Sequence, residues 1–202
     1  MSDVRDEGTD AAADALHDEP VDPDIVDSEL VYEGRVWDVR SDTFRYNGDE
    51  LVRQYVDHPG AAAIVAVDDD GRVLLIQQYR HPIRHRDWEI PAGLLDMEGE
   101  SPMAAAVREL EEEADLTASS WEPLVSIFTT PGGNDEVVHL FLARGISARD
   151  AAHAREAEEA DIRVEWVPMD EVVDAVLAGR MRNGILATGV LAAAELLRRD
   201  AR

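Results

Sequence analysis

The sequence predicts an α+β fold: an α/β/α sandwich with a mixed sheet, preceded by a small N-terminal antiparallel sheet. Three observations lead to this prediction. Apolar runs of strand length recur between residues 30 and 167, one amphipathic helix interrupts them after residue 101, and two further helical patterns close the chain. Strands that surround one helix and are followed by more helices indicate a layered domain.

The first 28 residues contain ten Asp and Glu against one Arg, and no aromatic residue. Such a composition cannot bury enough apolar surface to become ordered, which predicts a disordered acidic tail at residues 1–28. The full length of 202 residues suits one domain with extensions. We therefore place N-terminal antiparallel strands at residues 29–58 and the main domain at residues 59–202.

The N-terminal strands are predicted from their turns. Residues 30–40 have the pattern of strand, turn, strand, and Asn47-Gly48 forms a strong hairpin signal between residues 42–46 and 50–56. A sheet of this size is too small to be stable alone. We therefore expect these strands to serve in dimerisation.

The main domain contains further strands and two terminal helices. An Asp-rich turn at residues 68–71 and a Pro-Gly-Gly turn at residues 131–133 separate neighbouring strands. The strands are predicted at residues 61–67, 73–79, 88–93, 124–128, 137–142 and 162–167, and the helices at residues 169–178 and 185–198.

A helix of particular interest begins after residue 101. Ser101 suits its N-cap and Pro102 its first position. The apolar residues expected to face the core recur at spacings of four, three and four: Met103, Val107, Leu110 and Ala114.

The same helix carries Glu109, Glu112 and Glu113, which lie at i, i+3 and i+4 and therefore share one face. Like charges at this spacing destabilise an isolated helix by a few tenths of a kcal/mol per pair. A solvated acidic face is one interpretation. The other is a site for hard divalent cations such as Mg²⁺ or Mn²⁺, which prefer oxygen ligands.

The surrounding residues favour the second interpretation. The segment from Gly93 to Leu116 resembles the Nudix box, whose pattern is G-x5-E-x7-R-E-U-x-E-E-x-G-U with U aliphatic. The matching residues are Gly93, Glu100, Arg108, Glu109, Leu110, Glu112, Glu113 and Leu116. The resemblance implies the Nudix fold and cleavage of a nucleoside diphosphate linked to another group.

Two positions depart from the pattern. Six residues instead of five separate Gly93 from Glu100, so the extra residue lies in the loop before the helix. Asp115 stands where the box has its second Gly, and Asp tolerates left-handed backbone angles better than most residues.

The span from about residue 30 to residue 200 looks like the ADP-ribose pyrophosphatase branch of this family. The segments that carry this likeness are residues 78–82, 89–93, 131–136 and 158–163. It implies metal-dependent hydrolysis of ADP-ribose to AMP and ribose 5-phosphate. Hydrolysis of another nucleoside diphosphate sugar, and a non-hydrolytic module that senses ADP-ribose, are the alternatives.

The resemblance also implies the metal ligands. Glu109 and Glu113 come first, Glu112 follows, and the backbone carbonyl of Ala92 is a further ligand, for two or more Mg²⁺ or Mn²⁺ ions per site. Glu100 either binds metal, directly or through other groups, or supports the start of the helix.

Two other box residues are given catalytic roles by the same resemblance. Arg108 is expected to orient the carboxylates, and its alternative is a surface ion pair. Glu112 is expected to take part in catalysis beside the metal.

The catalytic base of this branch is a glutamate on a late loop, which corresponds to residues 146–160 here. Aligned on Asp161-Ile162-Arg163, Glu158 takes that position and Glu159 is one residue away. Both could instead be surface charges of the loop.

Substrate recognition is assigned to Arg53 and Arg80, whose guanidinium groups suit phosphate or ribose, and to Glu136. Either Trp37 or Trp88 could stack on adenine, although a single Trp on a strand usually belongs to a core. The two Arg residues have strand-edge salt bridges as their alternative. Members of the branch form homodimers, in which Arg53 or Trp37 would complete the partner's site.

The charge excludes several partners. With 44 acidic and 19 basic residues the net charge is -25, which argues against nucleic acid and anionic membranes. There is no Cys, and no apolar run of transmembrane length. We expect a cytoplasmic enzyme that acts on a small nucleotide sugar.

Overall fold

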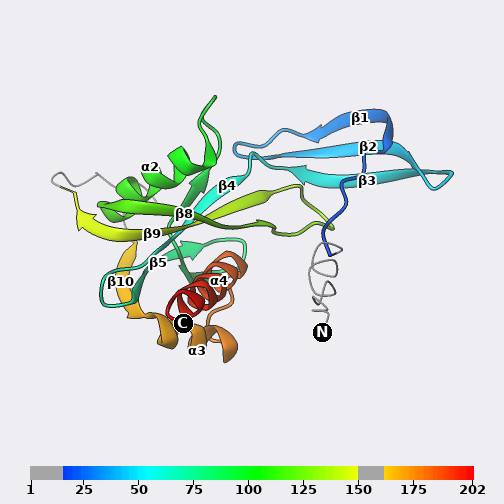
Figure 1. Cartoon of the computed structure of the whole chain (residues 1–202). Helices are drawn as coiled ribbons and strands as arrows, with labels where there is room; N and C mark the ends of the chain where they lie inside the picture. The colour runs from blue at the N-terminus through cyan, green and yellow to red at the C-terminus, as the bar shows by residue number, and fades with distance from the viewer. Residues whose placement is uncertain (1–15, 150–161) are drawn as a thin grey trace, which may run out of the picture. The chain divides into compact units, whose positions relative to one another are not determined.

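The computed structural model describes residues 16–149 and 162–202 (Figure 1). Its elements, in chain order, are β1 (Asp24–Tyr32), β2 (Asp38–Tyr46), β3 (Asp49–Asp57), β4 (Ala61–Ala66), β5 (Arg72–Arg80), β6 (His85–Glu89), β7 (Ala92–Leu94), α2 (Pro102–Ala114), β8 (Leu116–Phe128), β9 (Val137–Ala148), β10 (Arg163–Pro168), α3 (Met169–Leu177) and α4 (Gly184–Asp200). None of these helices has the length and apolar character needed to cross a bilayer.

The chain divides into two units, which we describe separately. The first comprises Met1–Glu29 and Ser41–Arg53, and the second comprises Leu30–Arg40 and Gln54–Arg202. Strands β1, β2 and β3 form a three-stranded sheet in that order. Asn47 and Gly48 both have positive φ, 52° and 88°, as a type I′ hairpin turn requires. The N-terminal sheet and its hairpin are therefore confirmed.

Strand β1 begins at Asp24, earlier than the boundary at residue 29. Residues 24–28 were predicted as part of the acidic tail because Asp and Glu dominate the composition of residues 1–28. Ile25 and Val26 are β-branched and favour a strand, and Asp24 accepts a 3.0 Å hydrogen bond from Arg45. Residues 1–15 of the predicted tail lie outside the described part of the chain.

The second unit is built on two sheets. The order β7-β4-β9-β8 forms one, in which β4 and β9 are parallel and the other pairs antiparallel; β10-β5-β6 forms the other. Helix α2 covers one side of the strands, and α3 and α4 cover the opposite side (Figure 1). The predicted α/β/α sandwich with a mixed sheet is confirmed.

Strand β4 is buried along its whole length and separates the two cores. Its odd-numbered residues face the core shared with α3 and α4, and its even-numbered residues face the core beneath α2. Gly189 lets α4 approach, because a Cβ there would lie 2.8 Å from the Leu140 side chain and 2.9 Å from that of Val65. Helices α2 and α4 therefore pack on opposite faces of β4.

The ends of α2 follow the sequence prediction. Ser101 is the N-cap, and its side chain accepts a 3.2 Å hydrogen bond from the backbone N–H of Ala104. Asp115 is the C-cap in the left-handed conformation, with φ 55°, and its backbone N–H donates to Leu110. Asp115 therefore adopts the left-handed conformation at the position where the box has glycine.

The predicted core stripe of α2 was partly wrong. The residues that α2 buries are Ala105, Ala106, Leu110 and Glu113, whereas Met103, Val107 and Ala114 are only partly buried. The small alanines face the sheet because they allow the helix to lie close to it. The stripe therefore rotates toward Glu113, which the sequence placed on the polar face.

Strand β8 is longer than predicted, since it begins at Leu116, directly after the helix, instead of at residue 124. The segment between contains Ser119, Ser120 and Pro123, and a register shift lies between Pro123 and Val125. These residues obscured the strand pattern. Pairing with β9 along almost the whole length of β8 stabilises it.

Candidate active site

The buried polar side chains of the described residues are Gln78, Glu89 and Glu113. They come from β5, β6 and α2, yet Gln78 bonds to Glu89 and the charge of Glu89 acts on Glu113. Burial of a carboxylate is costly unless hydrogen bonds or charges compensate it. Their gathering in one place indicates a functional site.

Glu113 lies at the centre of this cluster. It is 8% exposed, and its Oε2 accepts a 2.9 Å hydrogen bond from the backbone N–H of Ala92. Burial raises the pKa of Glu113 to about 8, and the negative charges of Glu109 and Glu89 act in the same direction. The bond from Ala92 and the charge of Arg80 oppose this shift. A further positive charge nearby would therefore favour the ionised form of Glu113.

The carboxylate of Glu109 rests directly on the backbone of Gly93. A Cβ at Gly93 would lie 1.9 Å from the carboxyl carbon and from Oε1 of Glu109. Any other residue would force the carboxylate away. The glycine that opens the box is thus explained by close approach, and Glu109 and Glu113 both lie over β7, one at Gly93 and the other at Ala92.

We expect Gly93→Ala to lower kcat/KM by about 10²-fold, the order of loss that a 1 Å displacement of an active-site group causes. The added methyl occupies the space of the Glu109 carboxylate, and the atoms nearest to it all belong to the side chain of Glu109. Steady-state kinetics and thermal melting check this. Wild-type kinetics in a Gly93→Ala protein would contradict the contact.

Arg108 binds three carboxylates. Its Nε and one terminal nitrogen donate to the two oxygens of Glu100 at 3.1 and 3.0 Å, and the other terminal nitrogen donates to Glu112 at 3.2 Å and to Glu109. The bonds to Glu100 chiefly raise the pKa of Arg108, and the same guanidinium lowers the pKa of Glu100. Arg108 thus occupies the place from which it could orient the carboxylates.

The donor set fits a hard divalent cation in kind. Among residues 16–149 and 162–202, no group of three His, Asp or Glu side chains converges closely enough to hold a metal alone, since Arg108 draws Glu100, Glu109 and Glu112 toward itself. The carboxylates of Glu109 and Glu113, which lie over β7 at Gly93 and Ala92, provide oxygen donors. A cation there would offset the burial and the carboxylate repulsion that raise the pKa of Glu113.

Arg80 projects from the end of β5 beside the same cluster. Its Nε and one terminal nitrogen donate to the two oxygens of Glu89, each at 2.7 Å. The bonds to Glu89 raise the pKa of Arg80, and the charges of Glu113 and Asp87 add to this. The structure therefore brings Arg80 to the carboxylates, as a substrate-binding role requires, but also gives it the ion pair of the alternative interpretation.

The other sequence candidates are placed as follows. Arg53 belongs to the first unit and donates to the carbonyl of Val52 at 2.8 Å. Trp37 is 44% exposed. Trp88 packs against the core, with the guanidinium of Arg163 over its ring at 5.8 Å. Glu158 and Glu159 lie outside the described residues.

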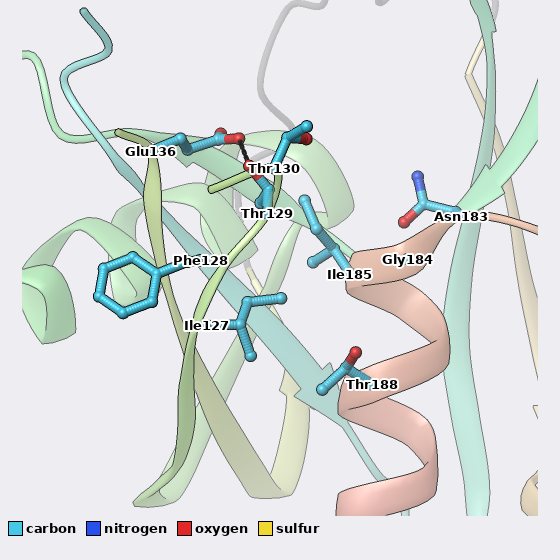
Figure 2. A pocket seen from close by; sticks show the side chains of 9 residues that line it. All are labelled: Ile127, Phe128, Thr129, Thr130, Glu136, Asn183, Gly184, Ile185 and Thr188. Carbon is cyan, nitrogen blue, oxygen red and sulfur yellow. Dashed lines mark hydrogen bonds between the residues drawn. The ribbon is translucent and has the colours of Figure 1, made fainter. Parts of the chain in front are cut away.

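Glu136 lines a cavity of about 470 Å³ between the end of β8 and the start of α4 (Figure 2). The lining residues are Ile127, Phe128, Thr129, Thr130, Glu136, Asn183, Gly184, Ile185 and Thr188. Glu136 accepts a hydrogen bond from Thr129 and lies 3.6 Å from Nδ1 of His58.

Asn183 connects this cavity to the carboxylate cluster. It caps α4 by accepting a 3.0 Å bond from Leu186, and it donates to Asp87 at 3.0 Å. Asp87 in turn acts on Arg80. Asn183 was not predicted as part of the site, although its place before an apolar helical pattern is the signal of an N-cap.

The comparisons with known proteins agree with this fold. The model of the NUDIX domain matches residues 57–186, and the chain belongs to the NUDIX family. The family and the enzyme class that the box predicted are therefore confirmed, and Nudix hydrolases generally need divalent metal ions.

An ADP-ribose pyrophosphatase of Mycobacterium tuberculosis is 44% identical over 174 residues, 85% of this chain and 83% of that protein. A methanol dehydrogenase activator of Bacillus methanolicus is 34% identical over 77% of this chain and 84% of its own length. A crystal structure of an ADP compounds hydrolase covers 92% of this chain and 100% of its own, with a TM-score of 0.75. At 20% identity it shows the fold alone.

Proposed function

We propose that the protein hydrolyses the pyrophosphate of ADP-ribose to AMP and ribose 5-phosphate with the help of divalent cations. The observation that carries this proposal is the carboxylate pair Glu109 and Glu113, held over β7 at Gly93 and Ala92 in a site with more carboxylates than guanidinium groups. The 44% identity to an ADP-ribose pyrophosphatase supports the choice of substrate.

Mg²⁺ or Mn²⁺, two or more per site, would be held by Glu109, Glu113 and the carbonyl of Ala92, with Glu112 as the next ligand. Bound cations neutralise the pyrophosphate and lower the pKa of a water molecule. We propose that Glu100 acts on the metal site through Arg108, because both its oxygens accept from this guanidinium, which also binds Glu109 and Glu112.

The chain's own side chains orient these groups. Arg108 fixes the carboxylates of Glu109 and Glu112 through its terminal nitrogen. We assign phosphate binding to Arg80 and base catalysis to Glu158.

Within the main domain, Glu136 contributes to the proposed substrate site from the cavity. In the homodimer, Arg53 or Trp37 completes the substrate site of the partner.

The experiment that tests this function is turnover with ADP-ribose, ADP-glucose, GDP-mannose, NADH and 8-oxo-dGTP, each with Mg²⁺ and with Mn²⁺. We expect the highest kcat/KM for ADP-ribose and no turnover with excess chelator. A higher value for another sugar nucleotide would support the alternative hydrolase. Binding of ADP-ribose without any turnover would support a sensing module.

The N-terminal strands are proposed as a dimer interface. All of β1 is exposed in the single chain, and its large apolar residues are Ile25, Val26, Leu30, Val31 and Tyr32. Exposed apolar residues gathered on one strand, next to an open sheet edge, mark an interaction site.

We expect Val31→Asp, but not Val31→Thr, to shift the protein toward monomer, because a charge on β1 opposes burial between two copies. Removal of residues 1–22, which precede β1, should leave a dimer. Light scattering at micromolar concentration measures both results. A wild-type protein that is monomeric there would refute the interface.

A further inference from the structure

Two of the buried polar side chains, Gln78 and Glu89, have no role in the function proposed above. The side chain of Glu89 is 7% exposed, and a buried carboxylate requires full compensation by its neighbours. Two side chains compensate the charge of the Glu89 carboxylate. Arg80 binds both oxygens at 2.7 Å, and the amide nitrogen of Gln78 donates to Oε2 at 3.3 Å.

The strand register explains why these residues meet. β5 and β6 are antiparallel, with Gln78 opposite Asp87 and Ile76 opposite Glu89. Residues two apart on a strand point to the same face. Gln78, Arg80 and Glu89 therefore project from one face of this strand pair, the face whose charges act on Glu113.

The ion pair leaves one edge of Arg80 available. A guanidinium has five N–H donors, and Nε and one terminal nitrogen of Arg80 are bonded to Glu89. Among the described residues the other terminal nitrogen of Arg80 makes no hydrogen bond, and the side chain is 46% exposed. A guanidinium anchored on one edge presents the other edge in a fixed plane, which suits two phosphate oxygens.

We propose that Glu89, supported by Gln78, is a positioning residue: it fixes the plane of Arg80 so that the outer edge of the guanidinium binds the pyrophosphate of the substrate. Glu89 itself does not touch the substrate. This inference rests on the proposed function and deepens it, because it adds the residues that prepare Arg80 for its role.

The test is a double-mutant cycle with Arg80→Ala and Glu89→Gln, which preserves the size of the side chain. Each single change should lower kcat/KM for ADP-ribose by about 10- to 100-fold, as loss of a charged hydrogen bond does. The fall should lie mainly in KM, since the contact forms in the ground state. The double variant should be no worse than Arg80→Ala, because Glu89 acts through Arg80.

Chemical rescue separates positioning from a structural role. Millimolar guanidinium chloride should restore part of the activity of Arg80→Ala, because a guanidinium ion can bind to the Glu89 carboxylate in the place of the missing Arg80 side chain. It should not restore the double variant. Additive losses in the cycle, or equal rescue with and without Glu89, would overturn the proposal.

The chain provides a matched control. Arg198 and Glu195 form the same two-bond pair at 2.7 Å on the exposed end of α4. Arg198→Ala should leave KM and kcat unchanged, with or without guanidinium. If Glu89→Gln proves unstable by thermal melting, Gln78→Met removes only the 3.3 Å bond and should raise KM by about two- to tenfold. An unchanged KM in that variant would contradict the support that we assign to Gln78.

The proposed hydrolysis of ADP-ribose and the positioning role of Glu89 can be refuted independently. A wild-type protein that hydrolyses none of the sugar nucleotides would overturn that function. The same variants would then be compared by calorimetry with inorganic pyrophosphate and Mg²⁺. Weaker binding with the same non-additive pattern supports the positioning role, and equal binding in all variants overturns it.

Discussion

Glu113→Gln is expected to abolish turnover while the fold remains intact, with kcat lowered by about 10³-fold or more, since the residue acts as part of a unit whose removal is costly. Glutamine keeps an oxygen that can accept the 2.9 Å bond from Ala92. It lacks the charge that a divalent cation needs. The loss should therefore accompany weaker Mn²⁺ binding, measured by calorimetry. Near-normal kcat at saturating Mg²⁺ in a folded variant would refute the assignment.

Glu111→Gln is the matched control for this change. Glu111 lies on the same helix, but its carboxylate is 3.5 Å from Arg149 and does not belong to the buried cluster. An exposed ion pair of this kind contributes about 0–1 kcal/mol. Kinetics and metal affinity should be those of the wild type.

The pH dependence of stability provides a second measurement on Glu113. Its pKa is raised from 4.5 to about 8 by burial and by the neighbouring carboxylates. The contribution of the protonated group is therefore complete below pH 4.5 and is lost as pH rises through 8. Metal-free wild type should lose stability over this range, whereas Glu113→Gln should lose less. Thermal melting in chelator at several pH values checks the difference, and parallel curves would contradict it.

Glu158→Gln is expected to lower kcat by about 10²- to 10⁴-fold, the usual contribution of a general base. Metal affinity and KM should change little, because residues 146–160 include none of the proposed metal ligands. Calorimetry with ADP-ribose should therefore still show binding. The basis is the register of Glu158 against Asp161-Ile162-Arg163, in a segment that precedes β10 and lies outside the described residues.

Glu159→Gln tests this register, because the assignment is exposed to a shift of one residue. We expect it to be much milder than Glu158→Gln. If Glu159→Gln is the inactive variant, the segment carries the base but the register is wrong. If neither variant slows the reaction tenfold, a carboxylate of α2 becomes the better candidate.

Local patterns were sufficient for much of this protein. The hairpin at Asn47-Gly48, the N-cap Ser101 and the C-cap Asp115 were all predicted correctly, because each depends on the backbone preference of one or two residues. The same holds for most strands and for the box, whose spacing places Glu109 and Glu113 on one helical face.

Tertiary structure decided the rest. The sequence placed Glu113 on a polar face, yet packing of α2 against the sheet buries it and raises its pKa. Only the folded chain brings Gly93 beneath Glu109, and only the pairing of β5 with β6 joins Arg80 to Glu89. Such contacts depend on distances between segments that are far apart in sequence. Periodicity reports which residues share a face, but burial and charge depend on what packs against that face.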